Sequence, residues 1–179
     1  MITVTGSSIS GGLRIVGESV PYTAGLYKTT FSGYFNDVPS WFATATSTAT
    51  LVQTTIIEES SADNGENFSM QWLGYFVPTT TETYTFFLSS DDASFMWIGA
   101  NAVSGFTTAN ATVNNAGLHG NVEKSGTASL AANVAYPIRI QFGELSGGDV
   151  LSFNHSTATI TKTTNVTGKV FYNLVTKGF

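Results

Sequence analysis

The chain has 179 residues, with 12 acidic and 7 basic side chains, a formal net charge of -5 and no cysteine. This length suits one domain with a substantial core, and the lack of cysteine excludes a disulfide scaffold and a thiolate metal site. An acidic chain without a basic stripe is a poor partner for nucleic acid, and no apolar run is long enough for membrane insertion.

The first segment, 1–24, begins with an alternating pattern and then becomes rich in glycine and serine. This composition predicts an N-terminal arm or an edge strand of the kind that pairs with another chain. We expect residues 25–179 to form a single β-rich domain, because aromatic residues (13%) outnumber charged ones (11%) and glycine is frequent.

Strand-like runs rich in aromatic and β-branched residues follow at intervals of about 8 to 12 residues, with turn residues between them. The residues expected to face inward are Leu26, Phe31, Phe68, Met70, Trp72, Trp97, Ile138, Ile140 and Phe142. No window of useful length has a helical period, and 100–126 is the longest stretch expected to be irregular. These patterns predict an all-β fold, an antiparallel two-sheet β-sandwich.

An acidic pair, Asp91-Asp92, lies between two of these runs, 84–88 and 95–98. Adjacent carboxylates with no lysine or arginine inside the segment repel each other, and a hard cation that prefers oxygen ligands, such as calcium, would offset the repulsion. Taken alone, the pair is more typical of a solvated acidic turn that joins two strands.

Several ordered motifs carry a resemblance to a known family: Leu73-Gly-Tyr-Phe76, then Tyr84 to Gly99 with Ser-Asp-Asp-Ala-Ser inside it, then Tyr136 to Phe153. Together they resemble the protective-antigen-type domain, which is named after the anthrax toxin component, and most closely its GLEYA variant of fungal adhesins. The resemblance covers about residues 68–155. The segment that begins at Gly25 is similar to modules of tailed-phage virion proteins.

The resemblance implies a protective-antigen-like β-sandwich of jelly-roll type, in which the two aspartates bind calcium and the calcium holds two hydroxyls of a sugar. Asp91 and Asp92 would then be ion ligands and part of the glycan site. The second ligand loop of the adhesins commonly offers an Asn where this chain has Glu144. A Glu can still coordinate calcium, and the main-chain carbonyls of Leu145 or Gly147 are candidates to complete the shell.

Two further residues are candidates for ligand contact. Trp41 follows a turn and is expected to be exposed enough to meet a glycan or a partner chain. His119 lies in the stretch expected to border the ion site, although an ordinary surface histidine is the simpler interpretation. His155 has no second histidine near it for a zinc site.

Three functions fit the sequence. The first is a calcium-dependent glycan-binding module on a virion surface, made in the host cytoplasm, that attaches to cell-surface glycans; an extracellular location is the alternative. The second is a structural virion protein, a capsid decoration or tail component, that contacts other virion proteins or itself and uses calcium as a staple. The third is a glycosidase domain, which needs two carboxylates across a cleft. If Asp91, Asp92 and Glu144 hold an ion, none is free as a general acid, so we expect no enzymatic activity.

Overall fold

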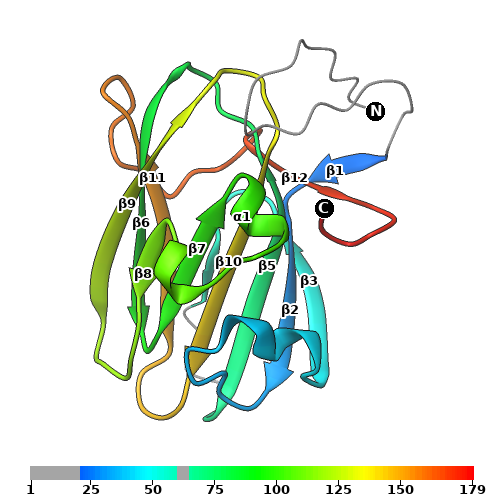
Figure 1. Cartoon of the computed structure of the whole chain (residues 1–179), viewed down its shortest axis with the longest axis vertical. Coiled ribbons are helices and arrows are strands. Elements are labelled where there is room, and N and C mark those ends of the chain that lie inside the picture. The colour runs from blue at the N-terminus through cyan, green and yellow to red at the C-terminus, as the bar shows by residue number, and fades with distance from the viewer. Residues whose placement is uncertain (1–20, 60–64) are drawn as a thin grey trace.

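The computed structural model describes residues 21–59 and 65–179, and in these ranges strands dominate (Figure 1). Their strands form two antiparallel sheets, of eight and four strands. The larger sheet has the order β1 (Tyr22–Ala24), β12 (Val170–Asn173), β5 (Phe68–Phe76), β10 (Tyr136–Glu144), β7 (Ser94–Ile98) and β8 (Val113–Asn115), with β2 (Leu26–Ser32) also on β5 and β3 (Ser47–Gln53) on β2. The smaller sheet has the order β4 (Glu58–Glu59), β11 (Val150–Ser156), β6 (Glu82–Asp91) and β9 (Val122–Leu130). This arrangement confirms the predicted two-sheet sandwich.

Only the end of the predicted N-terminal segment, 1–24, is described. Residues 1–20 lie outside the described residues, and Tyr22–Ala24 forms the short edge strand β1 against β12. The boundary predicted at residue 25 stays a prediction.

The main core lies between the two sheets. In β6 and β11 every second residue is buried, as expected for strands with one face on the core and one toward solvent. The predicted inward positions are confirmed: Phe68, Met70, Trp72, Ile138, Ile140 and Phe142 join this core, as does Leu26. His155 also belongs here, stacked on Tyr84 and Phe153, and burial lowers the pKa of its imidazole to about 4.

A second aromatic cluster covers the outer face of the larger sheet. It contains Phe31, Phe35, Phe42, Phe95 and Trp97. The 3-10 helix η1 (Pro39–Ala43), the segment between β2 and η1, the loops after β7 and Phe179 together supply this cover. Both faces of β5 and β10 are therefore buried along most of their length, which fixes the positions of the strand ends that form the site.

The stretch 100–126 was expected to be irregular, and this expectation is wrong. It contains α1 (Ala100–Val103), the 3-10 helix η2 (Thr108–Asn110), β8 and the first half of β9. These elements are too short to show a period in the sequence, and contacts such as the Trp97 indole N–H donating to the Thr107 carbonyl (2.9 Å) hold them in place. Among the described residues, no helix combines the length and the apolar character required to cross a membrane.

A glycine brings β8 close to the smaller sheet. A Cβ added to Gly126 would lie 1.6 Å from the carbonyl oxygen of Thr112, so no other residue fits where these two backbones meet. Because β8 leads directly into the segment 116–121, this contact positions one wall of the site described below.

We expect Gly126→Ala to lower the free energy of unfolding by about 2 to 4 kcal/mol, because the added methyl meets fixed backbone. Gly120→Ala is the matched control: nothing lies within 4 Å of the added Cβ, and a change within about 0.5 kcal/mol is expected. Urea unfolding of both variants measures the difference, and equal stabilities would contradict the close contact.

Candidate metal centre

The acidic residues lie where the chain crosses twice between the two sheets. Asp91 ends β6 in the smaller sheet, Asp92 follows, and β7 begins the return in the larger sheet; β10 ends with Glu144 in the larger sheet, and β11 resumes in the smaller one. The two crossings lie side by side, because Gly143 donates its N–H to the Ala93 carbonyl (3.0 Å). The acidic turn predicted between two strands is thus a crossover between sheets.

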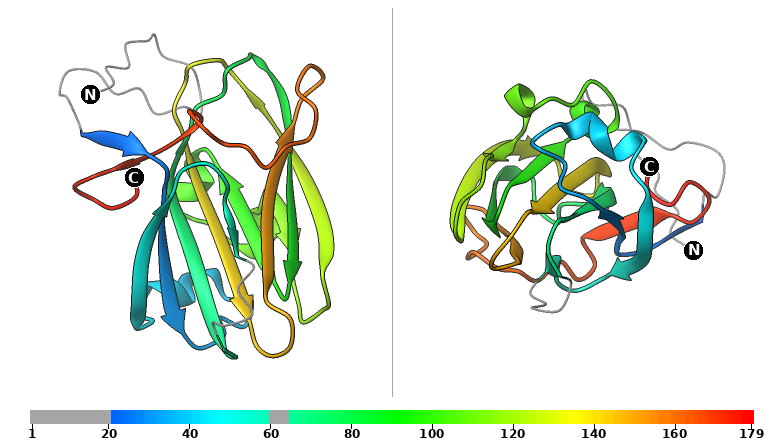
Figure 2. Two further views of the ribbon diagram at one scale, coloured as in Figure 1. Left: turned by 180° about the vertical axis from the view of Figure 1, so that it is seen from behind. Right: turned by 90° about the horizontal axis from the view of Figure 1, so that it is seen from below.

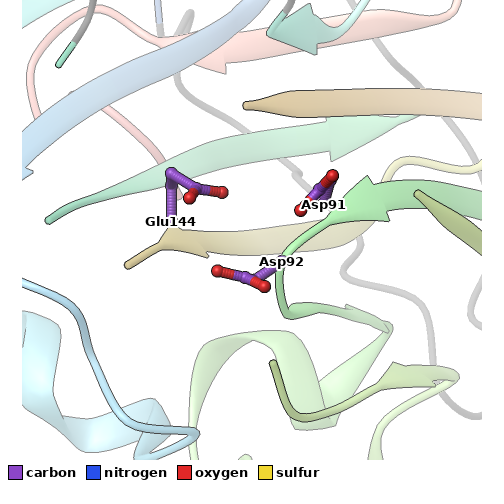
Figure 3. Close-up of side chains that lie close together, drawn as sticks. All are labelled: Asp91, Asp92 and Glu144. Carbon is purple, nitrogen blue, oxygen red and sulfur yellow. The ribbon is translucent and has the colours of Figure 1, made fainter. Parts of the chain in front are cut away.

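Three carboxylates converge at these crossings (Figure 3). One oxygen each of Asp91, Asp92 and Glu144 lies within 4.8 Å of the others. Asp92 and Glu144 are buried, with 5% and 0% of their surface exposed, and Asp91 is half-buried. The peptide bond between Asp91 and Asp92 is cis.

Backbone donors hold Asp92 in place. His119 donates its N–H to Oδ1 of Asp92 (2.9 Å), and Leu145 donates its N–H to Oδ2 (3.1 Å). The first bond comes from the segment after β8 and the second from the crossing after β10. Asp92 therefore connects three separate parts of the chain.

Glu144 differs from Asp92, because neither of its buried carboxylate oxygens accepts a hydrogen bond of normal geometry from the described residues. Burial, followed by repulsion from Asp92 and Asp91, raises the pKa of Glu144 to about 7, and the nearby backbone N–H of Asp92 opposes this rise only in part. Burial and the charge of Asp92 also raise the pKa of Asp91. A buried carboxylate without a donor is costly unless a proton or a cation accompanies it.

The loop after β10 lies against the aspartates. A Cβ added to Gly148 would be 3.1 Å from Oδ2 of Asp91, so this backbone approaches the carboxylate closely. The Leu145 carbonyl accepts the N–H of Asn67 (3.1 Å), and the Gly147 N–H donates to Oε2 of Glu66 (2.9 Å). The structure thus places Leu145 and Gly147 in this loop, and their roles as carbonyl ligands stay predictions.

The two predicted ligand-contact residues have different environments. His119 is half-buried beside the carboxylates: its N–H binds Asp92, and its charge lowers the pKa of Asp91. Trp41 is half-buried in η1, where its ring packs on Phe31 and Phe42. These ring contacts assign Trp41 to the second aromatic cluster.

Two further acidic residues lie at the rim of the site, in turns that border the three carboxylates, and they were not identified from the sequence. Asp37 accepts the N–H of Gly117 through Oδ2 (2.9 Å) and the hydroxyl of Tyr34 through Oδ1 (3.5 Å), and burial raises the pKa of its carboxyl. Glu66 holds the loop at Gly147, and its charge contributes to the raised pKa of Glu144. The only signal in the sequence is that both lie in turns, which says nothing of their distance from Asp92.

The donor set suits a hard divalent cation. Three carboxylates with a total charge of up to -3 converge at the site, and every candidate ligand atom is an oxygen, as calcium prefers. The Glu144 oxygens, to which the described residues donate no hydrogen bond of normal geometry, fit a metal-ligand role best. The residues therefore fit the ion that the predicted calcium site requires.

Comparison with known proteins shows what the chain is similar to. Residues 68–159 match the model of the GLEYA domain. The Epithelial Adhesin 6 A domain from Candida glabrata, solved in complex with Galβ1-3GlcNAc, is 19% identical with a TM-score of 0.67, over 85% of this chain and 88% of that one. The PA14 domain of the MpAFP antifreeze protein is 14% identical with a TM-score of 0.66, over 89% and 96%. The PA14 sugar-binding domain from an RTX adhesin is 14% identical with a TM-score of 0.60, over 80% and 98%. No curated protein sequence matches the chain.

The raised pKa of Glu144 predicts how stability depends on pH without metal. The folded state holds the Glu144 proton up to about pH 7, whereas the ordinary pKa is 4.5. The unfolded state loses its proton first, so the free energy of unfolding should fall as the pH rises from 4.5 to 7, by up to about 3 kcal/mol.

Glu144→Gln should remove this part of the pH dependence, whereas Glu66→Gln, which removes an exposed carboxylate with only a minor contribution to the raised pKa of Glu144, should leave most of it. Urea titrations in the presence of a chelator at several pH values measure the effect. If the Glu144→Gln and wild-type curves stay parallel between pH 4.5 and 7, the assignment is wrong.

Proposed function

Because the chain belongs to the GLEYA domain family, we propose that it is a calcium-dependent glycan-binding module of a surface-displayed attachment protein. Asp91, Asp92 and Glu144 would hold the ion, and the crossing after β10 would complete its shell. The observation that carries this proposal is the buried Glu144 carboxylate, which accepts no hydrogen bond of normal geometry from the described residues and lies close to two aspartates.

When bound, calcium supplies open coordination positions that neighbouring sugar hydroxyls can fill in place of water. The protein's own groups would orient the sugar around it. His119, next to Asp92, and Trp41, in the aromatic cluster near the rim, are the side chains we propose for ligand contact. Solved structures of similar fold carry Galβ1-3GlcNAc and Galβ1-4GlcNAc, which supports a glycan as the ligand class.

The charge of the rim supports a neutral glycan. Asp37 and Glu66 add two carboxylates to the three at the centre, and a divalent cation neutralises only part of that total. The charged neighbours that shift the pKa values of Asp37, Asp91 and Glu144 are carboxylates and His119, with no lysine or arginine among them. A sialylated or sulfated sugar would meet uncompensated negative charge.

An ion bound by the three carboxylates also argues against glycoside hydrolysis. A glycosidase needs one carboxylic acid free to donate a proton, and an ion shared by Asp91, Asp92 and Glu144 leaves none of them for that role. The Epithelial Adhesin 6 A domain and the sugar-binding domain from an RTX adhesin both come from adhesins, which also favours binding over catalysis. The virion context predicted from the sequence rests on resemblance alone, and the proposed function does not depend on it.

Calcium should bind the wild-type protein and raise its melting temperature, and Glu144→Gln should weaken calcium binding at least about tenfold because one charged ligand is lost. The variant keeps the metal-free fold, since the Glu144 oxygens accept no hydrogen bond from the described residues. Asp92→Asn should weaken calcium binding too, but it also costs stability without metal because a bond to His119 or Leu145 is lost. Calorimetric titration with a thermal scan measures both effects; a melting temperature indifferent to calcium and to a chelator contradicts the ion site.

A glycan array provides the test of sugar binding. We expect binding to neutral galactose-terminated glycans in calcium, loss of that binding in a chelator or in Glu144→Gln, and weak binding to the sialylated forms of the same glycans. Binding that persists in the chelator, or its complete absence with calcium bound, would favour the structural role.

A further inference from the structure

One long edge of the larger sheet is open. Strand β3 pairs on one side with β2, and no strand among the described residues lies on its other side (Figure 1). Its first five residues are exposed and its last two are half-buried. In an antiparallel strand every second residue turns its backbone N–H and carbonyl away from its neighbour, so β3 offers a row of backbone donors and acceptors.

Other edges in the described part of the chain are short or charged. Strands β1, β4 and β8 have 3, 2 and 3 residues. The other long edge strand, β9, carries Glu123 and Lys124, a common device against edge-to-edge pairing. Strand β3 has the sequence Ser-Thr-Ala-Thr-Leu-Val-Gln, with 7 residues and neither charge nor proline. It therefore lacks the features that usually prevent a free edge from pairing.

The side chains of β3 leave both faces of this edge accessible. Gln53 turns inward, where its Oε1 accepts the indole N–H of Trp72 (2.7 Å), and so Leu51 and Ala49 lie on the same inner side. Leu51 is nevertheless 47% exposed at this edge. Thr50 lies on the outer side, opposite Thr29 of β2.

We propose that β3 pairs with β3 of a second copy of this chain, antiparallel and centred on Thr50, to form a continuous sheet across a two-fold axis. This register places Thr50 opposite Thr50, Ala49 opposite Leu51, and Thr48 opposite Val52. Every pair joins uncharged side chains, and the exposed Leu51 gains an apolar neighbour. A second copy fits because the chain's net charge of -5 lies entirely outside this strand, so the two copies meet without like charges at the contact.

The contact is small. One pair of short strands buries less than the roughly 1,200 Å² of a standard interface, so the dimer should form and dissociate with concentration. Its affinity comes from the backbone ladder, with a lesser contribution from Leu51.

The pairing has a geometric consequence. The carboxylates lie at the end of the sandwich where β10 ends and β5 begins, and the antiparallel pairing of β5, β2 and β3 places the start of β3 at that same end. Two antiparallel copies of β3 therefore direct the two acidic sites in opposite directions. If the proposed function holds, the dimer joins two glycan-bearing surfaces; the dimer itself does not require glycan binding.

Charge pairing at Thr50 tests the proposal. Sedimentation velocity over a concentration series should show dimerisation of the wild-type protein, whereas Thr50→Lys alone and Thr50→Glu alone should raise the dimer dissociation constant at least about tenfold through like charges across the axis. An equimolar mixture of the two variants should form dimers again, because the charges are then opposite.

Thr127→Lys is the matched control, since Thr127 is an exposed threonine of the other long edge strand, opposite Thr85 as Thr50 is opposite Thr29. It should dimerise like the wild type, and circular dichroism should show the same fold for all variants. A wild type that stays monomeric at millimolar concentration, dimers that persist equally in both Thr50 variants, or a mixture that stays monomeric overturns the proposal. These readouts need no sugar, so they fail or succeed separately from the glycan array.

Discussion

The repulsion among three carboxylates is the interaction on which the functional end of this molecule depends. Asp91, Asp92 and Glu144 lie within 4.8 Å of one another, and two of them are buried. Backbone donors compensate Asp92, whereas the Glu144 oxygens accept no hydrogen bond of normal geometry from the described residues, and the pKa of Glu144 is raised to about 7. A proton or a divalent cation must supply the missing positive charge, and at neutral pH the cation is the better partner because it can serve all three groups at once.

The rest of the sandwich holds these groups at their positions. The site uses two adjacent crossings between sheets, and each crossing follows a strand buried in the core. Next to Asp91 in the chain, the hydroxyl of Ser90 lies 2.7 Å from that of Ser94, and the Asn115 amide donates to the Ser90 hydroxyl (2.9 Å). Figure 2 shows the two sheets from behind and from below, with the crossings at one end of the sandwich. Side-chain and main-chain packing thus keep the acidic groups close even though their charges oppose it.

The sequence predicted the elements well and their spatial relations less well. Alternating apolar residues such as Phe68, Met70 and Trp72 identified strands and core faces, because the period of two is local. The same local reasoning treated 84–98 as two strands joined by a turn and gave no sign that they belong to different sheets. It also missed α1, η2 and β8, which owe their form to tertiary contacts with Trp97 and Gly126.

For the candidate site, too, the sequence predicted some residues and missed those that tertiary contacts bring in. Asp91, Asp92 and Glu144 were identified through ordered motifs, and the structure brings them together. Asp37 and Glu66 were not, because each reaches the rim from a turn distant in sequence, through bonds to Gly117 and Gly147. Trp41 was expected to be available to a ligand, and its packing on Phe31 and Phe42 gives it a share in the second aromatic cluster as well. Contacts between distant turns leave no periodic trace in a sequence.

The polarity of the sandwich has a mechanical consequence. Strands β1 and β12, through which the described chain enters and leaves the sheet, pair near the end of β5 that is remote from the carboxylates. A pull between a ligand held at the acidic end and the chain at the other end would run along the strands and load their ladders in shear. Many backbone bonds would then have to break together instead of one after another, so the arrangement of the strands resists tension along the long axis of the sandwich.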